Sequence, residues 1–115
     1  MSNYTAGRAK EYKVMKFLDK QGYTTLRTAG SHGDWDVLAY KEGDCVEVVQ
    51  VKYNKEGMPT KNELIRFETA ALPFCARAYL VAFKRGQSSP FRVYERTCRE
   101  AGGIDFRDGD GEAWI

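Results

Sequence analysis

Hydrophobic residues recur at helical spacing near the start of the chain. Between about Thr5 and Gln21 they return to one face of a helix, whereas most lysines of this segment lie elsewhere. The stripe consists of Glu11, Val14, Met15, Leu18 and Gly22. Glycine commonly ends helices because it adopts a positive φ without strain. The pattern therefore predicts an amphipathic helix that ends at Gly22.

The following residues form short segments rich in β-branched and aromatic side chains, separated by polar, glycine-containing loops. Strands are expected over Tyr23–Thr28, Trp35–Tyr40, Cys45–Tyr53, Ala76–Lys84 and Phe91–Glu95. The strongest apolar run, Ala76–Lys84, is typical of a central strand. Thr60 and Glu63 form a capping-box sequence, which predicts a second helix that runs to about Leu72.

The order α-β-β-β-α-β-β indicates the fold class. Three strands joined by turns form a meander, and the second helix then crosses over to a central strand. We expect an α/β protein in which helices flank a mixed five-stranded sheet. Its 115 residues are expected to form a single domain, residues 1–115, with a core over about 5–95 and a tail over about 96–115.

Charge and cysteine content narrow the class of protein. The net charge is +2, but the acids gather near the C-terminus, so the body is basic and favours a polyanion partner over an ordinary solvated surface. Three widely spaced cysteines give no disulfide framework, and a single histidine excludes the common zinc sites. No apolar run suits a signal peptide or a membrane span. We therefore expect an intracellular, cytoplasmic protein with no membrane partner.

Candidate chemistry concentrates between residues 31 and 52. The segment Ser31-His32-Gly33-Asp34-Trp35-Asp36 is a glycine-containing loop that enters a strand at a carboxylate. The next strand ends in Gln50-Val51-Lys52, where the two-residue spacing puts Gln50 and Lys52 on one side. An acid, a further oxygen ligand and a lysine at one sheet edge suit metal-assisted phosphodiester cleavage.

Strand alternation and helical spacing indicate which other acids face the same side as Asp36, Gln50 and Lys52. Glu47 is three residues from Gln50, so a regular strand points it to the opposite face. Asp34 has the same parity as Asp36 and stays a candidate. Glu11 is the better one, because a charge on the inward stripe of a helix is costly unless it is paired or bound to metal.

These residues together resemble a known family. The motifs are Gly7-Arg8 and Glu11 in the first helix, Gly30-Ser31-x-Gly33-x-x-Asp36 at a strand entry, and Gln50-Val51-Lys52 at a strand end. Over about residues 5–95 the chain resembles archaeal-type Holliday junction resolvases of the PD-(D/E)XK nuclease superfamily, whose restriction-endonuclease-like core has this element order. The resemblance implies a homodimeric, Mg²⁺-dependent endodeoxyribonuclease, with Mn²⁺ as the alternative metal, that cleaves four-way DNA junctions in recombination and repair.

The resemblance also implies a role for each motif residue. Asp36 is then the central metal ligand, with Glu11 and Gln50 beside it. Lys52 is the catalytic lysine, which stabilises charge on the phosphate or orients the water. Ser31 contacts the scissile strand or its phosphate.

Gln50 departs from the family, which has a second acid at this position. A glutamine keeps one oxygen ligand but no charge, so the metal is held more weakly or draws on Glu11 and substrate phosphate. Two alternatives follow from this residue. One is another nuclease of the superfamily, Mrr-like or a repair enzyme, and the other is a DNA- or junction-binding module without catalysis. An engineered inactivating change would look the same.

A set of basic and loop residues is expected to contact DNA. Its members are Arg8, Lys10, Arg27, Ser31, His32 and Lys55. The backbone N–H groups of the Gly30–Gly33 loop suit a phosphate. Ser31 fits a turn equally well, and His32 fits a loop surface better than a general base.

Overall fold

The computed structural model describes residues 3–28, 34–72, 76–87 and 89–97. Its elements are α1 (Asn3–Lys20), β1 (Thr24–Arg27), β2 (Val37–Tyr40), β3 (Glu47–Asn54), α2 (Lys61–Thr69), β4 (Arg77–Lys84) and β5 (Pro90–Thr97). The predicted order of helices and strands and the α/β fold class are confirmed. Neither helix, over the residues described, has the length and apolarity that crossing a membrane requires.

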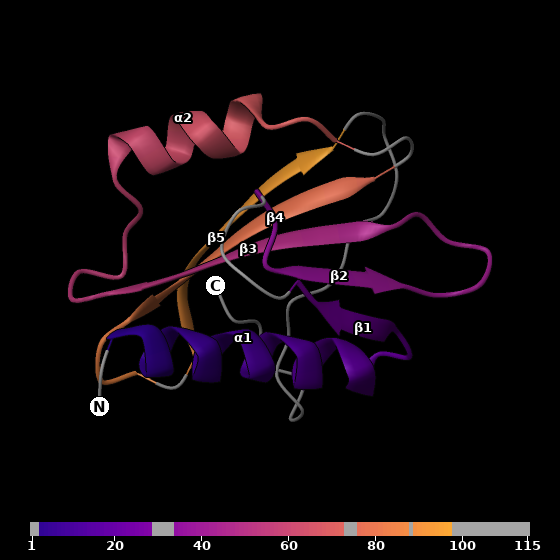
Figure 1. Ribbon diagram of the computed structural model, residues 1–115, viewed down its shortest axis with the longest axis horizontal. Coiled ribbons are helices and arrows are strands. Elements are labelled where there is room, and N and C mark those ends of the chain that lie inside the picture. Colours follow the sequence, from indigo (N-terminus) through magenta and orange to yellow (C-terminus); the bar gives the residue numbers. More distant parts are fainter. Residues whose placement is uncertain (1–2, 29–33, 73–75, 88, 98–115) are drawn as a thin grey trace.

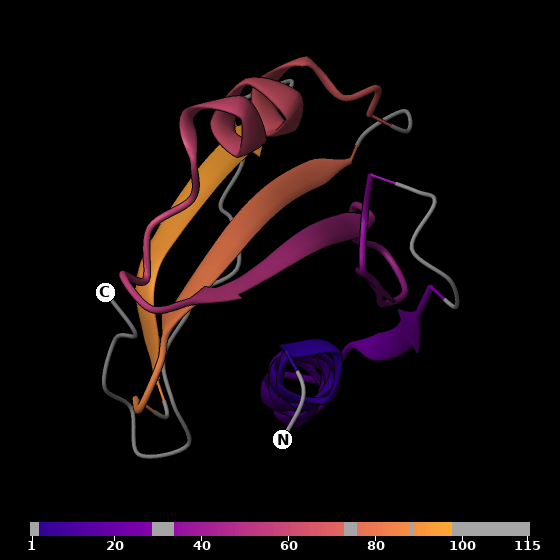
Figure 2. The same cartoon turned by 60° about the vertical axis from the view of Figure 1, so that its left-hand side comes forward.

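The five strands form one mixed sheet in the order β1-β2-β3-β4-β5. All neighbouring strands are antiparallel except β3 and β4, which run parallel because α2 connects them. Figures 1 and 2 show α1 and α2 on opposite faces of the twisted sheet. The sheet therefore separates two layers of side chains, and each layer has its own core.

The larger core lies between α1 and the sheet. Val14, Phe17 and Leu18 of the helix pack there against strand residues that include Val49 and Val51. On the other face, Phe67 of α2 packs with Val48, Ala78, Leu80 and Ala82. Strand β4 contributes to both cores and its residues Arg77–Phe83 are buried, which explains its continuous apolar sequence.

Local sequence explains how the two helices begin and end. Gly22, with φ of 92°, follows α1 as predicted. At the start of α2, the Glu63 main-chain N–H donates to Thr60 Oγ1 at 3.1 Å, and the Thr60 N–H donates to Glu63 Oε1 at 2.8 Å. This pair of bonds is the capping box that the sequence predicts.

Several element boundaries differ from the sequence prediction. Helix α2 ends at Thr69 rather than near Leu72, because Ala70 is extended and Arg96 Nη1 donates to the carbonyls of Phe67 and Ala70. Strand β5 continues to Thr97, so the first two positions of the expected tail belong to the sheet. The remainder of that tail lies outside the described residues.

Candidate active site

Strands β2 and β3 part at Asp36, the residue before β2. Their register ends at the Val37↔Val49 pair, whereas β3 stays paired with β4 as far as Asn54. The Asp36 main-chain N–H donates to the Val49 carbonyl at 2.8 Å. One step further, the Val51 N–H donates to the Asp36 carboxylate, at 2.7 Å from Oδ2. We call the point where β2 and β3 separate the fork. There the Asp36 side chain accepts the hydrogen bond that a β2 carbonyl would accept if the two strands stayed paired.

The two faces of β3 contribute different groups to this fork. Val49 and Val51 belong to the core under α1, and Val48 belongs to the core under α2. Since side chains alternate along a strand, Gln50 and Lys52 lie on the α2 side. Helix α1 approaches the fork from the opposite side of the sheet and carries Glu11.

Three charged side chains act on the partly buried Asp36 carboxyl. Burial raises its pKa above the ordinary value, and the Val51 N–H bond opposes this rise. The negative charge of Glu11 raises the pKa further, whereas Lys52 and Arg27 lower it. The structure thus brings Glu11, Lys52 and Arg27 into electrostatic range of Asp36 from α1, β3 and β1.

Glu11 and Arg27 form an ion pair beside this carboxyl. Glu11 Oε1 lies 2.8 Å from Arg27 Nε, and their side chains are 19% and 20% exposed. The Arg27 guanidinium also stacks 5.5 Å from the Tyr12 ring centroid. The charge of Glu11, on the side of α1 that faces the sheet, is therefore neutralised by Arg27. The sequence analysis expected Arg27 to contact DNA.

Gln50 is a buried hydrogen-bond donor. Its Nε2 donates to the Asp34 carbonyl oxygen at 2.6 Å, and its side chain and backbone together are 4% exposed. An ionised glutamate has no proton for that carbonyl, which gives this position a structural reason for an amide. Among the residues that the structure describes, the buried Gln50 Oε1 has no hydrogen-bond partner.

Lys52 is paired with a residue that the sequence did not connect to the site. Its Nζ lies 3.3 Å from Glu63 Oε2 in the first turn of α2. Burial tends to raise the pKa of Glu63, but the Thr60 N–H bond and Lys52 lower it overall. The capping box identified Glu63 as a helix-start residue, yet nothing in its spacing indicated which strand residue it would meet.

Two other acids that the sequence analysis considered have partners of their own. Asp34 Oδ1 lies 3.0 Å from Arg66 Nε of α2, in an exposed ion pair. Glu47 is fully buried and its Oε1 accepts from Arg77 Nη1 at 2.9 Å. Its position on β3 puts it on the opposite face from Gln50, so Glu47 does not join the group at the fork.

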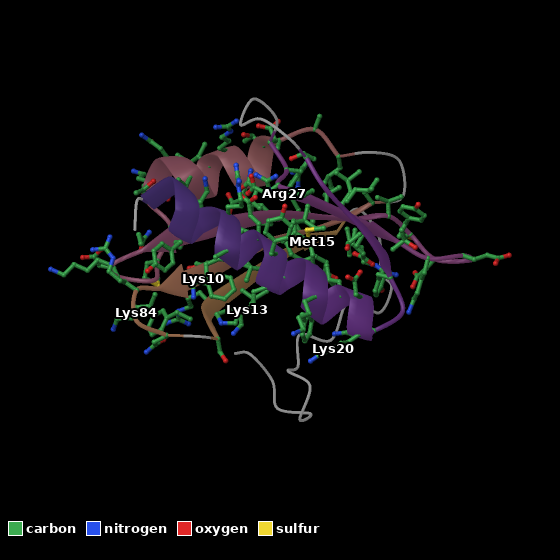
Figure 3. All side chains as sticks on the ribbon, turned by 60° about the horizontal axis from the view of Figure 1, so that its bottom comes forward. Lys10, Lys13, Met15, Lys20, Arg27 and Lys84 are labelled. Carbon is green, nitrogen blue, oxygen red and sulfur yellow. The ribbon has the colours of Figure 1, made fainter. Side chains whose placement is uncertain are left out.

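The residues predicted to bind DNA are distributed over several elements. Lys10 Nζ donates to the Gln87 carbonyl at 3.2 Å and lies 5.5 and 5.3 Å from the ring centroids of Tyr53 and Phe83. Figure 3 shows Lys10, Lys13 and Lys84 on one side of α1 and Arg27 on the other. Arg8 and Lys55 are exposed. Ser31 and His32 lie outside the described residues.

The side-chain oxygens near the fork are of the type that hard cations such as Mg²⁺ prefer. Within the described segments, no three His, Cys, Asp or Glu side chains gather as a metal-ligand group. The Asp36 carboxylate and Gln50 Oε1, which has no hydrogen-bond partner within the described segments, are nevertheless both oxygen donors on the strands that form the fork. Mg²⁺ is commonly held by one or two carboxylates and several waters. Glu11 adds a second carboxylate if it shares its charge between Arg27 and the metal.

Comparison with known proteins gives one match. The family model described as archaeal Holliday junction resolvase (Hjc) matches residues 2–108. No curated protein and no solved structure matches the chain. The family match includes the described site and also Ser31 and His32.

Proposed function

Because the chain belongs to the archaeal Holliday junction resolvase family, we propose that it is a metal-dependent endonuclease that cleaves four-way DNA junctions. The observation that carries the proposal is the fork at Asp36. A carboxylate fixed by the Val51 N–H there lies within electrostatic range of Lys52. Such a pair suits phosphodiester hydrolysis, because a carboxylate can hold a metal ion and a lysine can offset the negative charge that grows on the phosphate during attack.

Oxygen donors at the fork define the metal site of this proposal. Asp36 is the central ligand, Gln50 Oε1 offers a neutral oxygen, and Glu11 contributes charge from α1. When bound, Mg²⁺ or Mn²⁺ would supply Lewis-acid polarisation of the scissile phosphate and activation of water. Lys52 stabilises the charge that develops on the phosphate. Arg27, which pairs with Glu11, would bind a phosphate next to the scissile one.

DNA contacts in the proposal come from basic residues on several elements and from two polar residues that precede Asp34 in the sequence. They are Arg8, Lys10, Arg27, Ser31, His32 and Lys55. A four-way junction has two equivalent strands to cut, and a twofold dimer offers one site to each. We therefore include a homodimer in the proposal, to be checked by analytical ultracentrifugation of the free protein and of its junction complex.

The decisive experiment compares cleavage of a synthetic four-way junction with cleavage of linear duplex of the same sequence. With Mg²⁺ we expect paired cuts in the junction and little cutting of the duplex. Equal cutting of both substrates contradicts junction selectivity and favours another nuclease of the superfamily, Mrr-like or a repair enzyme. That alternative predicts a preference for linear, modified or flapped DNA.

A second candidate function is junction binding without cleavage, and the geometry of Gln50 favours it. Its amide is engaged as a donor to Asp34, whereas a second acid would strengthen metal binding. A binding module retains a salt-dependent affinity for junctions, with a log–log slope of about −0.9 per phosphate contact. It makes no cut at any concentration of Mg²⁺ or Mn²⁺, which separates it from the nuclease in the same assay.

A further inference from the structure

Lys52 belongs to β3, but its ammonium group pairs with a residue of α2. Its Nζ lies 3.3 Å from Glu63 Oε2 in α2. Within the described part of the chain, Glu63 is the acid in ion-pair contact with Lys52. We propose that Glu63 is a positioning residue for Lys52, an inference that rests on the proposed nuclease function.

The carboxylate of Glu63 is itself fixed in place. Its Oε1 accepts the Thr60 N–H at 2.8 Å, and its own N–H donates to Thr60 Oγ1 at 3.1 Å. Helix α2 packs on the sheet through Phe67, which is 2% exposed, and Arg66 of the same helix pairs with Asp34. A lysine has a flexible four-carbon stem, so a fixed carboxylate restricts where its ammonium can lie. Such restriction matters because catalytic groups act through their position.

Position 50 offers Lys52 no such partner. Gln50 shares the α2-facing side of β3 with Lys52, but it is neutral and its amide donates to the Asp34 carbonyl. The carboxylate in ion-pair contact with Lys52 therefore comes from α2. Each oxygen of Glu63 already has a partner, one in Thr60 and one in Lys52. This arrangement fits a residue that orients Lys52 rather than a metal ligand.

Two variants separate the charge of Glu63 from its part in the helix cap. Glu63→Gln keeps the capping box, because a glutamine oxygen also accepts the Thr60 N–H, but it removes the charge that faces Lys52. Thr60→Ala does the reverse, since it weakens the cap and leaves the carboxylate of Glu63. Arg66→Gln is a further control that removes another α2 ion pair without touching Lys52.

The first readout does not need activity. Limited acetylation of the free protein with acetic anhydride is followed at Lys52 by peptide mass spectrometry. We expect Lys52 to react about threefold faster in Glu63→Gln than in the wild type. This factor corresponds to the free energy that a partly exposed ion pair typically contributes. Thr60→Ala and Arg66→Gln should react like the wild type.

The second readout separates binding from chemistry. Single-turnover cleavage of a four-way junction should slow by about tenfold to a hundredfold in Glu63→Gln, the range expected when a catalytic group is misplaced. The junction Kd should stay unchanged, because Glu63 is not among the residues proposed to contact DNA. Thr60→Ala should lower the Tm but keep the cleavage rate.

Each outcome has one interpretation. Equal acetylation of Lys52 in the wild type and Glu63→Gln overturns the positioning role, as does faster acetylation with an unchanged cleavage rate. Equal loss of cleavage in Glu63→Gln and Thr60→Ala assigns the effect to helix stability and also overturns it. A wild type that binds junctions and never cuts them overturns the proposed function instead, and acetylation alone then decides whether Glu63 restrains Lys52.

Discussion

The main-chain N–H of Val51 and the carboxylate of Asp36 are joined by a 2.7 Å hydrogen bond at the point where β2 leaves β3. Without this bond, a strand N–H would lose its partner at the fork. The acid that we propose as the central metal ligand therefore also completes the hydrogen bonding of the sheet. Substitution at Asp36 has to be chosen so that the two roles can be told apart.

Asp36→Asn should abolish cleavage and leave the fold intact. The asparagine oxygen still accepts the Val51 N–H, so the free energy of unfolding should change by less than about 1 kcal/mol. Metal binding loses its central charge, and we expect cleavage to fall by more than about a hundredfold, since changes outside the ligand sphere already cost that much. Single-turnover cleavage and urea titration measure the two effects.

Asp34→Asn is the matched control for this prediction. Asp34 lies two residues away and pairs with Arg66 on the surface. This variant should cut junctions at the wild-type rate. If Asp34→Asn loses activity and Asp36→Asn keeps it, the central metal ligand has been assigned to the wrong acid.

Glu11→Gln should lower the pKa of Asp36. The pKa of this carboxyl is raised by burial and, in part, by the charge of Glu11, whereas Arg27 lowers it. The variant removes the acid and releases Arg27 from its ion pair, so both changes favour ionised Asp36. A ¹³C NMR titration of the side-chain carboxyl, without metal or DNA, measures the shift. A pKa that stays constant or rises would show that Glu11 does not act on Asp36.

Gln50→Glu tests why an amide occupies a buried position at the fork. A carboxylate there faces the Asp34 carbonyl without a proton to donate and adds a second negative charge near Asp36. In EDTA we expect the free energy of unfolding to fall by about 1–3 kcal/mol at neutral pH. Saturating Mg²⁺ should restore part of the loss, because a ligand that binds only the folded state stabilises it.

Gln50→Met is the control for the Gln50→Glu measurement. It also loses the bond to Asp34 but adds no charge, so its stability should not respond to Mg²⁺ more than that of the wild type. Cleavage assays on Gln50→Glu then separate the two proposed functions. A gain of cutting in a protein that was silent identifies a weakened nuclease, and continued silence favours a binding module.

Local sequence patterns were sufficient to predict the elements and the faces of this fold. Helical spacing placed Glu11 beside Val14 and Leu18, and strand alternation separated Glu47 from Gln50, because both rules depend only on backbone geometry. The Thr60–Glu63 capping box was equally local. These predictions needed no knowledge of how distant segments meet.

The partners of those side chains could not be predicted in the same way. The Lys52–Glu63 pair, the Gln50 bond to Asp34 and the Arg96 bonds to the end of α2 each join different elements. They depend on the strand register and on where α2 crosses the sheet, which periodicity does not determine. Arg96 shows the consequence, since nothing in the sequence near it indicates that its side chain binds carbonyls at the end of α2.

The buried Glu47–Arg77 pair predicts how stability depends on pH. Burial raises the pKa of Glu47 to about 7 although Arg77 opposes the rise, and Asp44 and Glu95 add to it. The native state therefore binds a proton that the unfolded chain releases near its ordinary value of 4.5. Stability falls as the pH rises wherever the native state holds more protons. The raised pKa of Asp36 acts in the same direction.

We expect the free energy of unfolding to decrease by roughly 2 kcal/mol between about pH 5 and pH 8, with most of the change complete near the pKa of Glu47. Urea titrations across this range measure it. Glu47→Gln keeps an oxygen that accepts from Arg77 and removes the titrating group, so its profile should be flatter than that of the wild type. A wild-type profile that is constant or rises over the same range would mean that Arg77 keeps Glu47 ionised at low pH, so that attraction within the pair exceeds the cost of burying the charge.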